Sequence, residues 1–319
     1  MSKINRINIL IKAKNVASTI RFTLFCFFVL LSAYNISAQI SEYKEVQLTN
    51  NSFDNSYASY NKVGGKIIFE SNRDGNWQIY IMEARGKRQK RLIKSTANDR
   101  RPTWHPYKNI VLFESDRSGI NELYTLDMKT KIISKIPISL TGNKSFGQFA
   151  PNGVEIMFSL EDTKEDFDIY ITHSKGRKPK KIVNDSYFNK YPRYSPRGDN
   201  IVYSSNKNNE RETDVIYLYN IITEERKRLS YFKDHSFNPV WSYDGRMIVY
   251  AASIKDEKSE IYTMRSDGVD KRRITFNNTE DLLPSWSPNR TNLLVTRLIN
   301  GNYHIVKIFL EESARQPRN

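Results

Sequence analysis

The chain has 319 residues, a formal net charge of +15 and a composition that is 39% hydrophobic and 12% aromatic. These values exclude a low-complexity or disordered chain and leave room for one large all-β domain or two ordinary domains. One cysteine, Cys26, excludes a disulfide framework.

Residues 1–38 have the pattern of a secretory signal peptide. Five basic residues and no acid occur up to Arg21, residues 22–33 are apolar or small, and Ala38 offers a small residue before a cleavage site. A run of twelve residues is too short to span a bilayer, which needs about 20. We therefore expect a periplasmic or secreted protein with no transmembrane segment after signal removal. Cleavage would lower the formal charge from +15 by 5 to +10 and remove Cys26.

The remainder of the chain repeats one pattern six times. Its anchor is an Ile-Tyr type pair whose second residue recurs at steps of 44, 46, 47, 45 and 43 residues. The pairs are Ile79-Tyr80, Leu123-Tyr124, Ile169-Tyr170, Ile216-Tyr217, Ile261-Tyr262 and His304-Ile305. A period near 45 residues built from short strands is typical of β-propeller blades with four strands each.

Within each repeat the strands can be read in order. An inner strand ends in an aromatic residue, at Tyr60, Trp104, Phe149, Tyr194, Trp241 and Trp286. We expect these aromatic side chains to be core. Nearly continuous apolar runs follow, at 66–71, 110–115, 155–160, 200–205, 247–252 and 292–297, and indicate strands buried on both faces. The Ile-Tyr runs form the third strands, and basic segments form the fourth.

The sixth repeat has no fourth strand of its own before the polar tail 311–319, which we expect to be disordered. Residues 43–49 match the fourth-strand pattern, so we predict that they pair with residues 303–309 and close the ring. The predicted fold is an all-β, six-bladed propeller over 39–310, with blades at 50–92, 93–136, 137–182, 183–229, 230–274 and 275–310 plus 43–49.

These motifs resemble the WD-like repeats of the TolB β-propeller family. The resemblance rests on Pro-x-Trp-Ser-Pro segments such as 284–288, on Ser-x-Arg-x-Gly at 71–75, on the Ile-Tyr pairs and on the basic strands, and it covers about residues 43–310. It implies a bacterial envelope protein. The first repeat begins close behind the predicted signal, so we expect no segment that corresponds to the N-terminal domain of TolB.

The basic residues lie in separate clusters on the fourth strands, such as 87–91, 178–181 and 271–273. Lysine on an outer edge strand blocks pairing between molecules. Specific nucleic-acid binding needs a continuous basic track, so we do not expect it. We expect a monomer.

One column of polar residues is predicted to ring the channel mouth. Counting three residues before the inner-strand proline gives Asn55, Asp99, Lys144, Asn189, Ser236 and Asp281, with Arg100, Lys190, His235 and Glu280 beside them. A polar ring around a channel is a natural site for a ligand. The alternative is that these side chains satisfy loop backbone groups. For the face as a whole we favour binding of an envelope protein, a peptide or a glycan.

Other chemistry has weaker support. Asp162, Glu165, Asp166 and Asp168 form an acidic loop that is a weak calcium candidate without the glycine spacing of a known calcium loop. No G-x-S-x-G, HExxH, CxxC or Walker motif occurs. We therefore expect a non-enzymatic binding protein without a cofactor. The alternative is a degenerate carbohydrate-active enzyme, lyase-like or hydrolase-like, that uses the same face.

Overall fold

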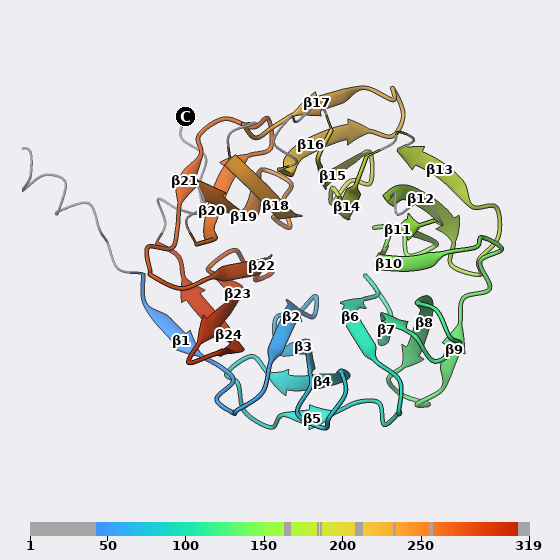
Figure 1. Cartoon of the computed structure of the whole chain (residues 1–319), viewed down its shortest axis with the longest axis horizontal. Coiled ribbons are helices and arrows are strands. Elements are labelled where there is room, and N and C mark those ends of the chain that lie inside the picture. The colour runs from blue at the N-terminus through green and yellow to red at the C-terminus, as the bar shows by residue number, and fades with distance from the viewer. Residues whose placement is uncertain are drawn as a thin grey trace, which may run out of the picture. The chain divides into compact units, whose positions relative to one another are not determined.

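The computed structural model describes residues 43–162, 167–183, 185, 187–207, 213–231, 234–254 and 258–311. These residues form six four-stranded antiparallel sheets and no helix. The sheets are arranged radially around a central axis, so the molecule is the six-bladed β-propeller that the repeat predicts (Figure 1). Among the described residues no helix has the length and apolar character needed to cross a membrane.

Each blade has four strands in order from the axis outward. The innermost strands are β2 (Asn55–Tyr60), β6 (Asp99–Trp104), β10 (Asn143–Phe149), β14 (Asn189–Tyr194), β18 (Asp234–Trp241) and β22 (Asp281–Trp286). The second strands are β3 (Lys66–Ser71), β7 (Ile110–Ser115), β11 (Glu155–Glu161), β15 (Asn200–Ser205), β19 (Met247–Ile254) and β23 (Asn292–Ile299). The third strands are β4 (Gln78–Glu83), β8 (Glu122–Asp127), β12 (Phe167–His173), β16 (Val215–Asn220), β20 (Glu260–Arg265) and β24 (Asn302–Phe309). The outer strands are β5 (Lys90–Arg91), β9 (Ile133–Lys135), β13 (Lys180–Val183), β17 (Arg226–Arg228), β21 (Arg272–Arg273) and β1 (Glu45–Gln47).

The hydrophobic core lies between neighbouring blades. Each of six buried clusters combines the facing sides of two adjacent sheets; one, for example, joins Ile68 and Ile79 of the first blade to Val111 and Phe113 of the second. The second strands are buried on both faces because they are sandwiched between blades, which explains their continuous apolar runs. Burial of the predicted aromatic wedge is confirmed for five members, and Trp104 is half-buried.

The first described strand closes the ring. β1 pairs antiparallel with β24, with Glu45 opposite Ile308 and Gln47 opposite Val306. The next residues continue the contact, since the Leu48 amide donates to the Ile305 carbonyl at 2.8 Å. The predicted pairing of residues 43–49 with the last strand is thus confirmed. Residues 1–38, the predicted signal peptide, lie outside the described residues.

Candidate functional site

The predicted channel-mouth column lies at the start of the inner strands, enclosed within the blades. Asn55, Asp99, Lys144, Asn189 and Asp281 have no exposed surface, and Ser236 is 1% exposed. The structure therefore places these six residues in equivalent positions but does not present them to solvent.

A repeated arginine clamp holds part of this column. Arg117 donates from Nη2 to Asp99 Oδ1 at 2.6 Å and from Nε to Ser115 Oγ at 2.9 Å, and its guanidinium lies 4.9 Å from the Tyr124 ring centroid. The first blade repeats the arrangement with Arg73 donating to Asn55 Oδ1 at 2.6 Å. This geometry gives the Ser-x-Arg motif and the Ile-Tyr pair a shared structural role: they fix the start of the inner strand.

The other four column residues also have contacts within their surroundings. Asp281 Oδ1 accepts a hydrogen bond from Arg297 Nε at 2.7 Å. Lys144 Nζ donates to the Leu140 carbonyl at 2.7 Å and pairs with Glu122 at 3.2 Å. Asn189 Nδ2 donates to Asp185 Oδ1 at 2.7 Å. The Ser236 amide donates to the Asp214 carbonyl at 2.8 Å.

The residues just before the column link neighbouring blades. In four blades this side chain accepts a hydrogen bond from a backbone amide at the start of the preceding blade's third strand, at 2.9–3.2 Å: Asp54 from Tyr303, Asn98 from Trp77, Asn143 from Asn121 and His235 from Asp214. His235 therefore occupies the position of an asparagine in this repeat. Its role as a channel ligand, like that of the column, stays a prediction.

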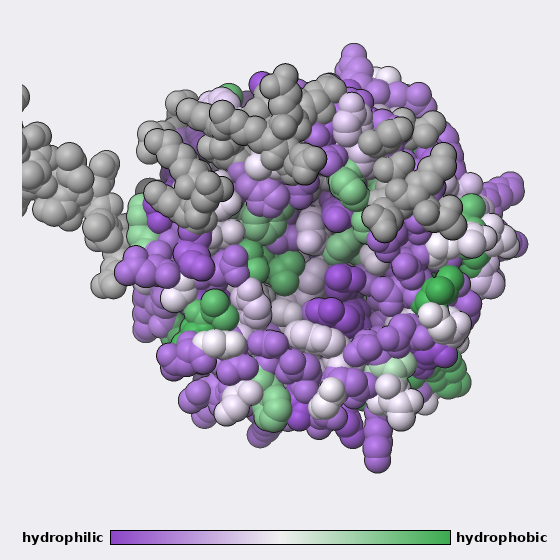
Figure 2. All heavy atoms as spheres, viewed as in Figure 1, coloured by the Kyte–Doolittle hydropathy of each residue, from purple (hydrophilic) through white to green (hydrophobic). Residues whose placement is uncertain are grey.

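The remaining predicted residues lie partly exposed near the same end of the channel. Arg100 pairs with Glu70 at 2.9 Å and lies 4.2 Å from the Trp77 ring. Lys190 lies over the Phe167 ring at 4.3 Å. Glu280 accepts a hydrogen bond from the Tyr303 hydroxyl at 2.7 Å. Figure 2 shows one face of the ring, mostly hydrophilic, with hydrophobic residues gathered beside the hollow at its centre.

The calcium candidate is only partly described. Glu165 and Asp166 lie outside the described residues. Asp168 is 7% exposed and accepts a hydrogen bond from Lys181 at 2.6 Å. In the part of the chain that the structure describes, no three His, Cys, Asp or Glu side chains are grouped to hold a metal ion.

A buried ionic network links the first two blades. Arg101 donates from its amide to Glu70 at 2.6 Å and from Nη1 to Glu114 at 2.5 Å. Burial raises the pKa of Glu114, and Arg101 only partly offsets this. Burial acts in the same direction on Glu70, but Arg100 and Arg101 together bring the pKa of Glu70 below its usual value. The negative charges of Glu70 and Glu114 are thus balanced by arginine side chains of the protein itself.

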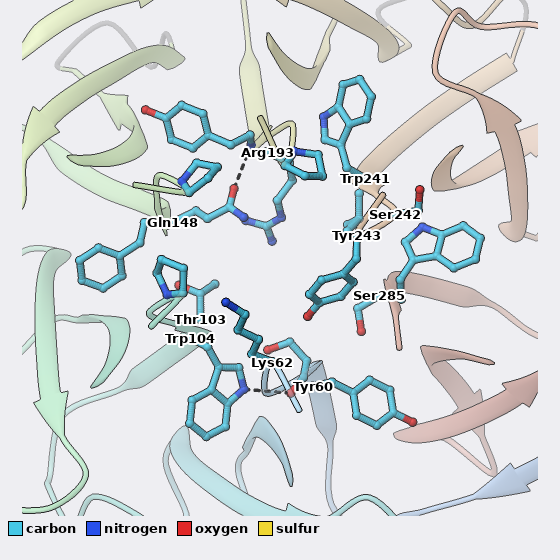
Figure 3. Close-up of a pocket in the computed structure, with 18 of the residues that line it drawn as sticks. Tyr60, Lys62, Thr103, Trp104, Gln148, Arg193, Trp241, Ser242, Tyr243 and Ser285 are labelled. Atoms are coloured by element: carbon cyan, nitrogen blue, oxygen red, sulfur yellow. Dashed lines mark hydrogen bonds between the residues drawn. The ribbon is translucent and has the colours of Figure 1, made fainter. Parts of the chain in front are cut away.

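The sequence did not single out a central pocket of about 440 Å³. It is formed by the second halves of the inner strands and the turns that follow them, at the opposite end of the strands from the predicted column. One side chain per blade, each just before the aromatic wedge residue, lines it: Ser59, Thr103, Gln148, Arg193, Val240 and Ser285. Figure 3 shows Thr103, Gln148, Arg193 and Ser285 around the axis.

A β-bulge in every inner strand precedes this ring. The residue two positions after the column residue has a positive φ, between 49° and 59°, in all six blades. These residues are Tyr57, Arg101, Phe146, Tyr191, Asn238 and Leu283. Pairing with the second strand shifts register there. A bulge re-aims the following side chains, and a left-handed non-glycine residue is a cost that the surroundings must offset. Six-fold recurrence makes the bulge part of the blade design.

The charge in the pocket is asymmetric. Arg193 and Lys62 are the cations among its lining residues, and the described lining contains no Asp or Glu. Arg193 Nη2 donates to the Tyr57 hydroxyl of the opposite blade at 2.6 Å, so this contact crosses the channel. Its Nη1 is enclosed without a hydrogen-bond partner in the described structure. Lys62 Nζ lies 4.6 Å from the Tyr107 ring.

The histidine at the pocket rim is neutral by environment. His105 Nδ1 accepts hydrogen bonds from the Tyr107 and Lys108 amides at 3.0 Å each, and Nε2 lies 3.2 Å from the Gly153 carbonyl. Burial lowers the pKa of His105, and nearby Lys108 adds to this. The ring therefore fixes the turn after β6.

Known structures share this fold. TolB from Acinetobacter baumannii is 19% identical with a TM-score of 0.62, over 82% of this chain and 64% of that one. An oligogalacturonate lyase in complex with manganese is 15% identical with a TM-score of 0.60, over 87% and 96%. A puromycin-hydrolyzing peptidase of Mycobacterium tuberculosis is 14% identical with a TM-score of 0.54, over 81% and 47%.

Among curated proteins, the uncharacterized peptidase YuxL of Bacillus subtilis (strain 168) is 29% identical over 108 residues. The match spans 33% of this chain and only 16% of that protein. The match to a curated peptidase, together with a fold shared with a lyase and a peptidase, contradicts the expectation of a non-enzymatic protein, and that expectation was wrong. The physical reason is that one propeller scaffold hosts both catalytic and non-catalytic sites, so missing hydrolase motifs do not exclude catalysis.

A family model described as the TolB beta propeller domain matches residues 38–211, more than half of the chain. The match agrees with the repeat motifs and with the six closed blades. The chain belongs to the TolB β-propeller family.

Proposed function

We propose that this propeller recognises a small ligand, or an extended segment of a partner, in the central pocket formed by the turns after the inner strands. The observation that carries the proposal is the pocket itself: about 440 Å³ with aromatic and proline walls and a few polar groups on its axis. Ligand sites in proteins are concave, mostly apolar and supplied with a small number of oriented polar groups.

Rigidity supports the same role. The pocket walls are the inner strands of six sheets that are locked to one another by core clusters and by side-chain hydrogen bonds to the preceding blade. A preformed site loses little conformational entropy when it binds. Tyr107 and Tyr243, which are 67% and 46% exposed at the rim, offer aromatic surface for a first contact.

The proposal extends to location and partners. With residues 1–38 removed, the propeller would act outside the cytoplasm, as a monomer, on an envelope protein, a peptide or a glycan. Recognition in the pocket is needed whether or not a chemical step follows, so the proposal is independent of catalysis.

Saturation-transfer difference NMR on residues 39–319 tests the proposal. The probes are a defined set of tripeptides and of mono- and disaccharides. We expect at least one probe to receive saturation from wild type and to lose at least about tenfold in affinity in Tyr243→Ala. Phe53→Ala is the matched control, because Phe53 is an aromatic of similar exposure (44%) just before β2, at the other end of the strands.

Two outcomes would overturn the proposal. One is the absence of a signal from every probe. The other is equal binding by wild type and Tyr243→Ala together with a loss in Phe53→Ala, which would move the site to the end of the channel where the polar column lies.

A further inference from the structure

The two cationic residues of the pocket stand at positions where the other blades have uncharged residues. The position of Arg193 is occupied in the other blades by Ser59, Thr103, Gln148, Val240 and Ser285, none of which is charged. Five blades therefore fold without a cation there. The guanidinium is not required by the blade design, so its presence in one blade needs another explanation.

Lys62 departs from the repeat in the same way. Two residues after the aromatic wedge, four blades have proline, at Pro106, Pro151, Pro196 and Pro288, while the first blade has Lys62 and the fifth has Tyr243. Lys62 is exposed and forms no ion pair in the described structure. Arg193 and Lys62 belong to opposite blades, and Figure 3 shows their side chains entering the pocket from opposite sides.

The hydrogen-bonding capacity of Arg193 is largely unused. A guanidinium carries five N–H donors. Arg193 donates one hydrogen bond to the Tyr57 hydroxyl, and its enclosed Nη1 has no partner among the described residues. Ser59 Oγ, also on the lining, is buried without a partner. The neighbouring acids do not compensate, since Glu70 and Glu114 are engaged by Arg100 and Arg101.

A site with two cations, unused donors and no lining acid is complementary to an anion that brings acceptors. We propose that the central pocket recognises a carboxylate, bound by Arg193 on the channel axis and attracted by Lys62 at the rim, on a ligand whose body packs against the aromatic and proline walls. This inference rests on the proposed function and specifies the chemistry of its ligand.

A carboxylate fits better than a phosphate for two reasons. A planar guanidinium pairs with a planar carboxylate through two parallel hydrogen bonds. One guanidinium on the axis matches a single negative charge, while the mostly apolar walls would leave the further oxygens of a dianion without donors.

The carboxylate could belong to a peptide C-terminus or to an acidic sugar, and paired probes distinguish the two. The first pair is the tripeptide acetyl-Gly-Pro-Phe as the free acid and as the C-terminal amide. The second pair is glucuronate and methyl glucoside. Each pair holds the body nearly constant and changes the charge. Affinities are measured by calorimetry and by fluorescence, because three of the four tryptophans line the pocket.

We expect the acid of one pair to bind wild type at least about tenfold more tightly than its neutral partner. Arg193→Gln should remove most of this preference, leaving only the smaller part that Lys62 contributes, while the neutral probe binds unchanged. Lys62→Gln should reduce the preference by a smaller factor, and the reduction should fade with added salt because Lys62 is exposed. Preference within the peptide pair would identify a chain end, and preference within the sugar pair a uronate.

Failure of this inference differs from failure of the pocket proposal. If acid and neutral probes bind equally and Tyr243→Ala weakens both, the pocket binds ligands and the carboxylate inference falls. If the preference for the acid persists undiminished in a folded Arg193→Gln protein, the inference also falls. If no probe binds at all, both proposals fall.

Discussion

Replacing Asp99 by alanine tests whether the polar column is structural. The Asp99 carboxylate is fully enclosed, lies 2.6 Å from Arg117 Nη2 and accepts from Ser95 Oγ at 2.8 Å. Removing one partner of a buried ion pair costs about 3–5 kcal/mol. The Arg117 side chain is 24% exposed and can be partly rehydrated, so we expect the lower end, about 3 kcal/mol.

Urea denaturation followed by circular dichroism measures this loss as a lower midpoint at unchanged slope. For a domain of this size the loss corresponds to a fall in Tm of about 5 °C. The control is Glu83→Ala. Its partner Arg88 is 84% exposed, so we expect less than about 1 kcal/mol.

A double-mutant cycle that combines Asp99→Ala with Arg117→Met isolates the interaction energy between these two side chains from the other effects of each substitution. A coupling energy of about 1–3 kcal/mol is expected for residues in direct contact. The folded Asp99→Ala protein should bind pocket ligands as wild type does. Unchanged stability together with lost binding would refute the structural interpretation and restore the column as a ligand site.

Three further predictions concern stability. A methyl group on Gly142 (φ +114°) would lie 2.2 Å from the Glu161 carbonyl, so Gly142→Ala should cost more than about 2 kcal/mol by urea denaturation, while Gly119→Ala (φ +93°, open space) should cost about 1. Since the pKa of His105 is lowered on folding, the unfolded chain binds more protons, and stability should fall between about pH 7 and pH 5; a titration in which His105→Gln leaves this slope unchanged would contradict the assignment. Deleting residues 43–49 should lower the urea midpoint clearly, because β24 then becomes an open edge, and a midpoint equal to wild type would show that this closure is not stabilising.

The sequence alone determined the fold. Its period near 45 residues, its apolar second strands and the missing outer strand of the last blade predicted six sheets and their closure by residues 43–49. Such predictions succeed because hydrophobic periodicity and strand count are local properties of the sequence, and the same local pattern recurs in six repeats. The separate basic clusters likewise marked the outer strands.

Only the tertiary structure decided which polar residues are enclosed within the blades and which line the central pocket. Asp99 and Arg193 are both polar residues of inner strands, yet Asp99 is enclosed by Arg117, which follows it by 18 residues, and Arg193 reaches the axis beyond a bulge and contacts Tyr57 136 residues away. The spacing of the repeat places a residue on a strand. The bulge and the arginine clamp decide which way its side chain faces and which group balances its charge. Such contacts are set by the fold, so a reading along the sequence could not separate the enclosed column from the pocket lining.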